Sequence, residues 1–442
     1  MKQNISPLHW IFNPGDGIFY SAHIKIGIKG EKMIGTPKSL RLQIALVGRV
    51  NSGKSSFLNL VSGQRVAITS TQRGTTTDVV EKAQELIPLG PVLWLDTAGT
   101  DDDSALGKKR GERTLQAIDR ADIMLIVTTP NVWGEAEEKL LDLARKRNIP
   151  AIPVVNKIDT AKCEGEFLAA LKEKCGSTPV TANSLGGDAE RDRVLNALKS
   201  ELLASAPEDF LAPPPMLGDL LPGHGGLVVL IVPIDMQAPK GRLILPQVQA
   251  IRDALDADAQ VLVVKEDRYS AALANLKNPP DLVVCDSQVV DKMVAETPET
   301  IPCTTFSILL SRLKGDIVRL AAGVNAIGSL RPGDRVLMAE ACTHHATHED
   351  IGRVKIPRLL EKQAGGKLEF DFSGGRDFPE DLSPYKLIVH CGSCMLNRRE
   401  TLRRLERAGN TPVTNYGMAI SYCRGVLKRV LSPFPDALGQ VR

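Results

Sequence analysis

Residues 41–56 read RLQIALVGRVNSGKSS. The apolar run Leu42–Val47 predicts a buried strand, and Gly48–Ser55 then spells GxxxxGKS, a complete phosphate-binding loop. In such a loop the glycines let backbone N–H groups face a polyphosphate, the lysine reaches the β- and γ-phosphates, and the serine hydroxyl ligates Mg²⁺. A helix should begin at Lys54 and run to about Val61, which adds the positive end of its dipole to the site.

Apolar runs recur after this loop, at Val92–Leu95, Ile123–Val127 and Ile152–Val155, with helical patterns between them. This alternation predicts an α/β fold over residues 38–206, with a parallel sheet and helices on both faces. Sheets of this kind bind ligands at the carboxyl ends of their strands, and the other motifs of the domain fall there.

Two further motifs carry the nucleotide chemistry. Asp96-Thr97-Ala98-Gly99 places a carboxylate near Mg²⁺, through water, and a backbone amide near the γ-phosphate. Asn156-Lys157-Ile158-Asp159 supplies a carboxylate that accepts both N–H groups of the guanine edge, a pair that adenine lacks, so the motif selects GTP. In a polar loop, Thr76 or its neighbour Thr75 can complete the Mg²⁺ shell, and Val180-Thr181-Ala182 should close over the base.

The predicted GTP site is a P-loop GTPase site. Catalysis is assigned to Lys54, Asp96 and Gly99, and Mg²⁺ to Ser55 and Thr76. The residues expected to bind GTP are Gly48, Asn51, Ser52, Gly53, Lys54, Ser55, Ser56, Thr75, Thr76, Asp96, Gly99, Asn156, Lys157, Asp159, Thr181 and Ala182.

The order and spelling of these motifs resemble the translation-factor-related GTPases, in particular the TrmE and Era group, over residues 40–206. The residue after DTAG is Thr100, so the water-orienting glutamine of Ras-like enzymes is missing. Asn51 stands where potassium-activated members of the group carry an asparagine, which implies K⁺ beside the phosphates in the place of an arginine finger. A loop-capping role for Asn51 is the alternative. The distant glutamate that TrmE-type enzymes use has no match here, so the residue that positions water stays unassigned.

The composition limits what the rest of the chain does. Its 442 residues are enough for about three domains, and a net charge of +3 is too mild to indicate a nucleic-acid partner. No apolar run approaches the roughly 20 residues of a membrane span. A nucleotide enzyme with scattered cysteines indicates a reducing, cytoplasmic setting. Residues 1–37 are expected to be an N-terminal extension, and with Met33 as an alternative start it stays open whether residues 1–32 are native.

Two smaller α/β units are predicted after the first. The proline-rich residues 207–226 read as a linker. Residues 227–330 alternate strands and a helix without a catalytic constellation, which suggests scaffolding or self-association, and Cys285 and Cys303 are expected in the core. Residues 331–442 hold the remaining candidate site.

Three thiols and two histidines follow two apolar strands of the third unit. Cys342 and His344 come after RVLMAEA, and His390, Cys391 and Cys394 end or follow KLIVH. If the strands are parallel neighbours, these ligands meet in one crevice. The spacing of the last two cysteines lets two sulfurs hold one metal centre, and the helix that follows would stabilise the thiolates. Zinc and iron–sulfur chemistry are equally compatible with this ligand set.

The chain from about residue 33 to 434 resembles the HydF family, the maturation GTPases of FeFe-hydrogenases. The resemblance is closest in CTHHATHEDIGRVKIP, DFSGGRDFP, HCGSCMLNRRE and TNYGM. It implies that the middle unit dimerises and that Cys342, Cys391 and Cys394 hold a 4Fe–4S cluster, with His344 or His390 as candidates for a fourth ligand.

The same resemblance implies a function: the protein carries a two-iron precursor of the H-cluster and delivers it to apo FeFe-hydrogenase. The implied partners are the radical-SAM maturases HydE and HydG, with no nucleic acid and no membrane. The alternative is a TrmE- or Era-like GTPase of RNA modification or ribosome assembly with a structural metal site. That alternative calls for a basic face or an RNA-binding module after Ala206.

Overall fold

The computed structural model describes residues 9–13, 18–22, 36–63, 80–97, 105–234, 241–341, 350–375 and 377–442. The chain divides into two compact units, residues 1–37 and 38–442. In the first unit, β1 (His9–Asn13) and β2 (Ile18–Ala22) form an antiparallel pair. The second unit carries all the motifs discussed above.

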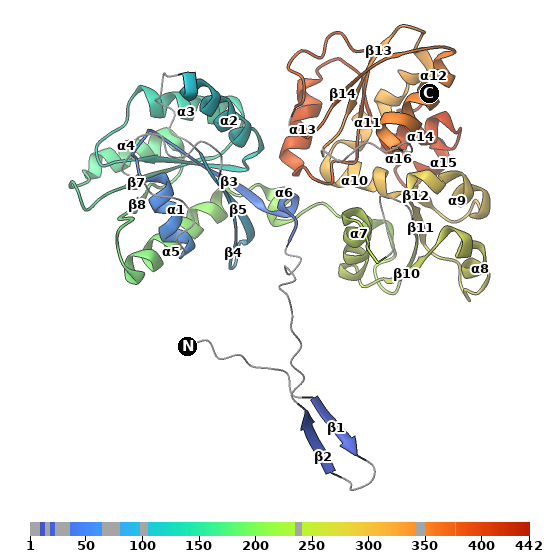
Figure 1. Cartoon of the computed structure of the whole chain (residues 1–442), viewed down its shortest axis with the longest axis horizontal. Coiled ribbons are helices and arrows are strands. Elements are labelled where there is room, and N and C mark those ends of the chain that lie inside the picture. Colours follow the sequence, from blue (N-terminus) through green and yellow to red (C-terminus); the bar gives the residue numbers. More distant parts are fainter. Residues whose placement is uncertain are drawn as a thin grey trace. The chain divides into compact units, whose positions relative to one another are not determined.

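The second unit begins with a six-stranded sheet in the order β4-β5-β3-β6-β7-β8 (Figure 1). The apolar runs form its central strands because a strand that is covered on both faces needs apolar side chains at nearly every position. Accordingly, β3, β6 and β7 are buried along their whole length. The strands are β3 (Leu42–Val47), β4 (Val80–Leu86), β5 (Gly90–Asp96), β6 (Ile123–Thr128), β7 (Ala151–Asn156) and β8 (Val180–Ala182).

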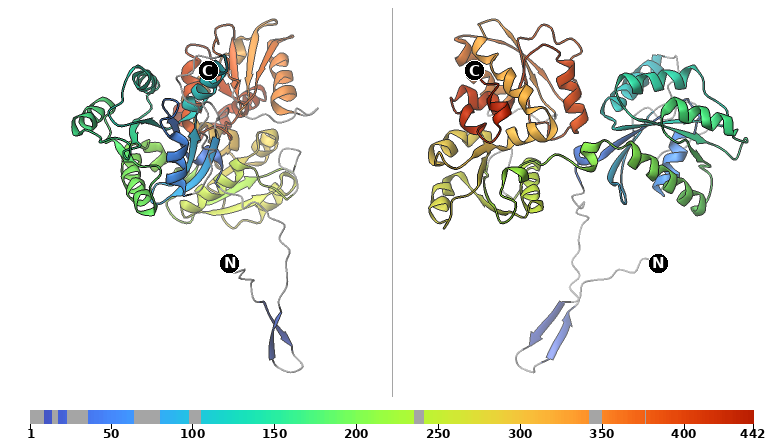
Figure 2. Two further views of the ribbon diagram at one scale, coloured as in Figure 1. Left: turned by 60° about the vertical axis from the view of Figure 1, so that its left-hand side comes forward. Right: turned by 180° about the vertical axis from the view of Figure 1, so that it is seen from behind.

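Helices cover both faces of this sheet (Figure 2). Alternate side chains of β3 point to opposite faces: Ile44 packs in one core with α1 and α5, and Ala45 packs in the other with α2 and α3. The predicted α/β fold is therefore confirmed. The helices are α1 (Lys54–Ser62), α2 (Ala105–Arg120), α3 (Glu135–Lys146), α4 (Gly165–Cys175), α5 (Asp188–Ser205) and α6 (Glu208–Leu211).

One strand departs from the predicted parallel sheet. β4 runs antiparallel to β5, with Val80 opposite Asp96 and Leu86 opposite Gly90. Its sequence, VEKAQEL, lacks the apolar run of a central strand because β4 lies at the edge, where Leu86 alone of its residues is buried. Charged side chains at an edge also discourage pairing with other chains.

Two four-stranded parallel sheets follow, in the orders β10-β9-β11-β12 and β14-β13-β15-β16. Residues of both sheets belong to one continuous hydrophobic core, for example Val229 and Val389. The strands are β9 (Leu227–Ile231), β10 (Gln260–Val264), β11 (Leu282–Cys285), β12 (Cys303–Thr305), β13 (Arg335–Ala339), β14 (Glu369–Ser373), β15 (Leu387–His390) and β16 (Val413–Asn415). The α-helices are α7 (Leu245–Asp256), α8 (Tyr269–Ala274), α9 (Val290–Glu296), α10 (Phe306–Lys314), α11 (Ile317–Val324), α12 (Ile356–Ala364), α13 (Arg398–Arg407), α14 (Tyr416–Cys423), α15 (Leu427–Val430) and α16 (Pro435–Leu438).

The second half of the proline-rich stretch packs against α7. Met216 and Leu217 are buried, and the backbone N–H groups of Leu217 and Gly218 both donate to Asp253 Oδ2 at 2.7 Å. These hydrogen bonds hold residues 217 and 218 against α7, before β9 begins.

Cys285 at the end of β11 and Cys303 at the start of β12 are fully buried, as predicted. Burial raises the pKa of both thiols, which keeps them protonated and unreactive. None of the helices in the described part of the chain is long and apolar enough to cross a membrane.

Candidate functional sites

The phosphate loop between β3 and α1 depends on two glycines. Gly48 has φ +145°, and a Cβ there would lie 2.2 Å from the carbonyl oxygen of Val127. Gly53 has φ +91°, and a Cβ there would lie 2.2 Å from Asn156 Nδ2. A larger residue at either position would push the loop away from β6 or β7. The loop ends at the N-terminus of α1, where the positive end of the helix dipole is suited to phosphate oxygens.

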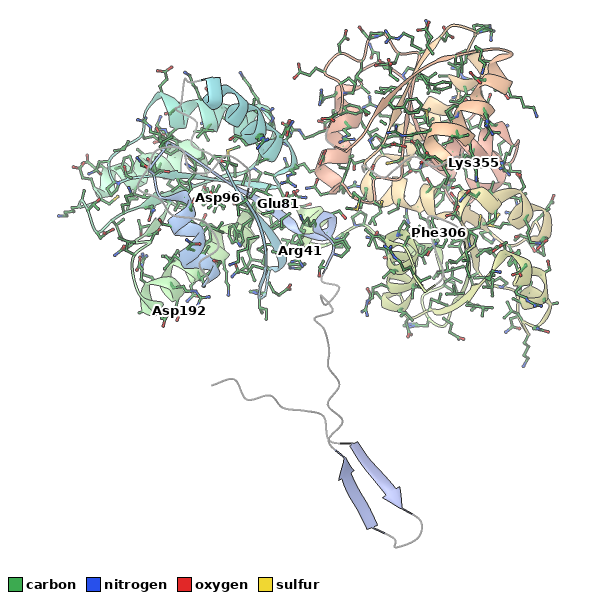
Figure 3. All side chains as sticks on the ribbon, viewed as in Figure 1. Arg41, Glu81, Asp96, Asp192, Phe306 and Lys355 are labelled. Atoms are coloured by element: carbon green, nitrogen blue, oxygen red, sulfur yellow. The ribbon has the colours of Figure 1, made fainter. Side chains whose placement is uncertain are left out.

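Three polar side chains meet at the ends of β3 and β5. They belong to Lys54, Ser55 and Asp96, and the last of these is labelled in Figure 3. Lys54 Nζ donates to the carbonyl oxygens of Gly48 and Arg49 at 2.9 and 2.8 Å, and Ser55 Oγ donates to Asp96 Oδ2 at 2.7 Å. Burial raises the pKa of Asp96, against the opposing effects of the serine hydrogen bond and the lysine charge.

The second carboxylate oxygen of Asp96, Oδ1, is buried and has no hydrogen-bond partner within the described residues. Such an orphaned oxygen needs an explanation, and an ion or its bound water supplies one. Together with the Ser55 hydroxyl, it forms the oxygen donor set that Mg²⁺ prefers. The residues present therefore fit the metal that the motifs imply.

Asn156 and Lys157 of the NKID motif hold the phosphate loop. Asn156 is fully buried, and its Nδ2 donates to the carbonyl oxygens of Ser52 and Gly53 at 3.2 and 3.3 Å. Lys157 Nζ donates to the carbonyl oxygen of Asn51 at 2.7 Å. These two side chains thus tie the phosphate loop to the end of β7.

Asp159, in contrast, is exposed and can face a guanine edge. The base side of the site also contains Ser184, which the sequence analysis did not single out: its hydroxyl donates to Asn156 Oδ1 at 2.6 Å. The signal for Ser184 was its place just after Val180-Thr181-Ala182. Those residues form β8 next to β7, and Ile158 N donates to the Ala182 carbonyl at 3.3 Å.

Of the other predicted site residues, some are described by the structure and some lie outside the described part of the chain. Ser56 lies in the first turn of α1, and Asn51 is exposed with φ +64°. Five predicted residues lie outside the described part of the chain: Thr75, Thr76, Gly99, Cys342 and His344.

The two strands that precede the candidate metal ligands are parallel neighbours. β13 pairs with β15, with Ala339 opposite His390. Cys391 follows directly, and its N–H donates to the Ala339 carbonyl at 2.9 Å. In return, the Ala341 N–H donates to Cys391 Sγ at 3.1 Å. The residue that precedes Cys342 is therefore in contact with the sulfur of Cys391.

The loop that carries Cys391 and Cys394 is held by residues that the sequence analysis missed. Lys314, at the end of α10, is 2% exposed, and its Nζ donates to the carbonyl oxygens of Ser393, Cys394 and Leu396 at 3.3, 3.2 and 2.6 Å. Ser39, which precedes β3, donates through Oγ to the same Cys394 carbonyl at 2.8 Å. These contacts join residues far apart in sequence, so no local pattern announces them.

The charge of Lys314 opposes the effect of burial on the Cys394 thiol. Burial lowers the pKa of Lys314 to about 8, while the nearby Cys394 and Cys391 sulfurs act in the opposite direction. Burial raises the pKa of Cys394, and the Lys314 ammonium group and backbone N–H groups oppose that rise. A buried ammonium group beside two sulfurs stabilises negative charge on them, as an electron-rich metal centre requires.

His390 is buried at the end of β15. Its Nδ1 lies 3.0 Å from the Cys391 carbonyl oxygen and 3.3 Å from Ser393 Oγ, while Nε2 is buried without a hydrogen-bond partner in the described structure. Burial, and then the charge of Arg404, lower the pKa of His390 to about 4, so the imidazole is neutral at pH 7. A neutral ring with one free nitrogen is the form in which histidine binds metals.

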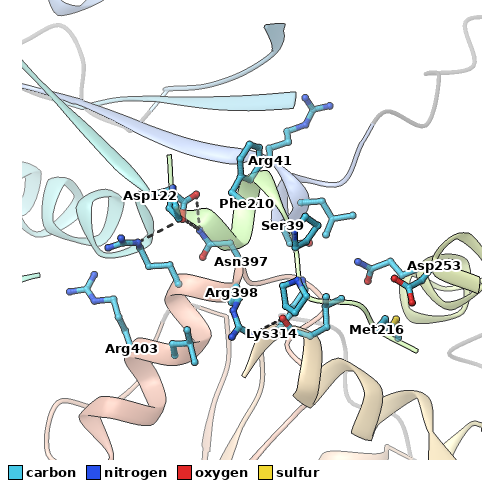
Figure 4. A pocket seen from close by; sticks show the side chains of 18 of the residues that line it. Ser39, Arg41, Asp122, Phe210, Met216, Asp253, Lys314, Asn397, Arg398 and Arg403 are labelled. Carbon is cyan, nitrogen blue, oxygen red and sulfur yellow. Dashed lines mark hydrogen bonds and ion pairs between the residues drawn. The ribbon is translucent and has the colours of Figure 1, made fainter. Parts of the chain in front are cut away.

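Helix α13 follows the loop that carries Cys391 and Cys394, here called the cysteine loop. The start of this helix contacts the six-stranded domain (Figure 4). Asn397 Nδ2 donates to the Arg120 carbonyl at 2.9 Å and lies 3.3 Å from Asp122 Oδ1. Arg399 Nη1 donates to the Asn148 carbonyl at 2.8 Å. The same contact region encloses a cavity of about 570 Å³ that Ser39 and Asn397 help to line.

Three family models match the chain. The model described as "50S ribosome-binding GTPase" covers residues 43–157, "Hydrogen maturase F dimerization domain" covers residues 216–315, and "Hydrogen maturase F tetramerization domain" covers residues 318–433. The first match contains the phosphate loop, and the third contains Cys342, Cys391 and Cys394.

Among curated proteins, the chain is similar to GTPase Der of Persephonella marina, with 36% identity over 142 residues, 31% of this chain and 32% of that protein. It is also similar to the tRNA modification GTPase MnmE of Synechococcus sp. (strain JA-2-3B'a(2-13)), with 43% identity over 129 residues, 28% of this chain and 27% of that protein. The chain thus spans about a third of the length of these relatives.

Among solved structures, a variant of Era from Aquifex aeolicus bound to GDP and AlF₄⁻ matches 50% of this chain and 93% of its own, with 21% identity and a TM-score of 0.34.

The two matches specific to hydrogen maturase F, behind a GTPase domain with its complete phosphate loop, identify this chain as a GTPase of the hydrogen maturase F family.

Proposed function

We propose that this protein combines GTP hydrolysis with the carrying of an iron–sulfur cluster in the maturation of FeFe-hydrogenase. In this proposal, residues 38–206 bind GTP, residues 227–330 associate with a second copy, and residues 331–442 hold the cluster. The protein delivers a two-iron precursor to apo FeFe-hydrogenase and works with the radical-SAM maturases HydE and HydG. The hydrogen maturase F models support this reading over RNA modification.

The contact between Ala341 N–H and Cys391 Sγ, at 3.1 Å, carries the cluster proposal. Cys342 directly follows Ala341 in the sequence, and Cys394 is three residues after Cys391. Three thiolates from this region would hold three irons of a 4Fe–4S cluster. The fourth iron, with His344, His390 or water as its ligand, supplies an exchangeable position for cargo.

In the GTPase domain, the proposal gives each polar group a role. Lys54 and the loop N–H groups bind the β- and γ-phosphates, Ser55 and Thr76 ligate Mg²⁺, and Asp96 holds a metal-bound water. Asn51 provides an oxygen ligand for K⁺, which would supply positive charge where Ras-like enzymes use an arginine. Asn51 is exposed and has a left-handed backbone conformation.

The proposal is tested by maturation of apo-hydrogenase in vitro, with anaerobically prepared protein loaded in the presence of HydE and HydG. Hydrogen evolution should be lost with both Lys54→Ala and Cys394→Ser. GTP hydrolysis should be lost with Lys54→Ala alone and stay within about twofold of wild type with Cys394→Ser. Cys163→Ser, which changes a cysteine of the GTPase domain, is the matched control and should mature the hydrogenase normally. Full maturation by Cys394→Ser would refute the proposal.

The potassium proposal has a separate test. GTP hydrolysis should be at least several-fold faster in KCl than in NaCl at equal ionic strength, and Asn51→Ala should remove that difference. Equal rates in the two salts would contradict the role of Asn51 and leave the cluster proposal untouched.

A further inference from the structure

A second cavity, of about 320 Å³, lies between α2, the end of α3 and α13, away from the phosphate loop and the cysteine loop. Its lining contains three carboxylates, from Asp119, Glu380 and Glu400, and more guanidinium groups than these can neutralise. The arginines are Arg120, Arg147, Arg403, Arg404 and Arg407. Arg120 is already paired with Glu81, which lies outside the lining, so the cavity wall carries an excess of one positive charge.

Two of the three carboxylates form ion pairs with arginines of the cavity lining. Asp119 Oδ1 pairs with Arg147 Nε at 2.6 Å and with Arg403 Nη2 at 3.2 Å. Glu400 Oε1 pairs with Arg404 Nη2 at 3.0 Å. Asp119 is thus shared by two guanidinium groups, so the cavity lining holds more positive than negative groups.

Two arginines of the cavity lining have N–H donors left for a ligand. Arg404 is 4% exposed, and its Nη1 is buried with no hydrogen-bond partner in the described part of the chain. Arg407 donates to the neutral carbonyl of Pro379 at 2.8 Å. Both guanidinium groups lie over the ring of Phe378, with their carbon atoms 5.0 and 5.4 Å from its centroid. Such stacking fixes the planes of the two groups and leaves their N–H edges to bind a ligand.

Neighbouring arginines also act on Arg403, after the larger effect of burial. Burial, together with the neighbouring Arg147 and Arg399, lowers the pKa of Arg403, against the effect of Asp119. The part of this shift that comes from the neighbouring arginines has the direction that a positive local potential produces.

We propose that this arginine-lined cavity binds a small oxyanion of the inorganic phosphate type. Planar guanidinium forks match the oxygens of such an anion, and its negative charge offsets the excess of the wall. A bound anion would join α2, which follows the DTAG motif, to α13, which follows Cys391 and Cys394. The proposal is independent of the cluster and of GTP turnover.

The test is calorimetric titration of inorganic phosphate into the full chain, with the nucleotide site filled by excess GDP and Mg²⁺ in a chloride buffer. We expect one phosphate site per chain, competed by sulfate and unaffected by further GDP. Arg404→Gln and Arg407→Gln should each weaken it at least tenfold. Arg358→Gln, an exposed arginine on α12, is the matched control and should leave it unchanged. Since Arg404 is buried, thermal unfolding must show that its variant folds, and the exposed Arg407 gives an independent test.

Three results would overturn the proposal. The first is no binding by the wild-type chain at millimolar phosphate. The second is unchanged binding by folded Arg404→Gln and Arg407→Gln. The third is loss of the site with Lys54→Ala or displacement by excess GDP, because either would assign the phosphate to a nucleotide site.

Discussion

The side-chain amide of Asn397 lies 3.3 Å from Asp122 Oδ1, and the other oxygen of that carboxylate accepts the backbone N–H of Gln43 at 2.8 Å. Gln43 belongs to β3, which leads into the phosphate loop, and Asn397 is three residues after Cys394. Two polar side chains thus connect the strand before the phosphate loop with the loop that carries two candidate cluster ligands.

Asn397→Asp should break this connection and leave α13 intact. Asn397 Oδ1 accepts the Glu400 N–H as the helix cap, and aspartate caps equally well. A carboxylate facing Asp122, however, replaces a hydrogen bond with repulsion, at a cost of about 1–3 kcal/mol. Hydrogen exchange should become faster in residues 115–122 and 393–400. Asn415→Asp keeps the cap of α14 and controls for the added charge, and an identical exchange pattern in both variants would contradict the role of Asn397.

Gly53→Ala should abolish tight GTP binding. The added Cβ would lie 2.2 Å from Asn156 Nδ2, and φ +91° strains any other residue. Relief of this clash separates the phosphate loop from Asn156, so affinity for a GTP analogue should fall at least tenfold. Gly165→Ala, at a helix start with open space around it, is the control. Wild-type affinity in Gly53→Ala would show that the loop does not need this geometry.

The stability of the GTPase domain should depend on Glu81 in an acid-sensitive way. Burial alone would raise its pKa, but hydrogen bonds and charges from Lys38 and Arg120 lower it to about 2. A lowered carboxylate pKa stabilises the fold above the unfolded value near 4.5, and this contribution is lost as the pH falls from there to about 2. Because the Lys38 side chain is 66% exposed, we expect on the order of 1–2 kcal/mol at pH 6.

Urea unfolding of wild type and Glu81→Gln at pH 6 and pH 3 measures this contribution. The difference between the two proteins should be largest at pH 6 and smaller at pH 3. A difference that stays constant, or grows on acidification, would show that Glu81 does not stabilise the fold as an ion.

The edge of the second sheet predicts a surface for self-association. β10 is an edge strand with Val263 42% exposed, and Val248 and Leu255 on α7 are 47% and 53% exposed. Apolar side chains gathered beside an open edge indicate an interface. Val248→Glu with Val263→Glu should lower the mass measured by light scattering at micromolar concentration. Leu185→Glu, on an exposed loop of the GTPase domain, should not. A wild-type monomer would contradict self-association altogether.

Residues with local signals were predictable. Leu42–Val47 had to be a buried strand because all its side chains are apolar or flanked by apolar ones, and GxxxxGKS fixed the loop after it. β4 was missed as an antiparallel strand because an edge strand needs no apolar run.

The residues that support the loop of Cys391 and Cys394 could not be predicted, for a different physical reason. Lys314 occupies the last turn of α10, where a basic residue usually faces solvent, and only the folded chain turns its Nζ onto carbonyls some 80 residues away. Ser39 similarly reaches Cys394 across 355 residues. Such contacts depend on how the sheets pack, and no local pattern encodes them.

The central claim is that Cys391 and Cys394 hold an iron–sulfur cluster in a GTPase of this family. The most direct measurement counts iron and acid-labile sulfide in anaerobically purified protein and records its EPR spectrum after reduction. We predict about four of each per chain and a 4Fe–4S signal, which Cys391→Ser loses and Cys423→Ser, on α14, retains. One zinc and no iron, or equal loss of the cluster in Cys423→Ser and Cys391→Ser, would contradict the account.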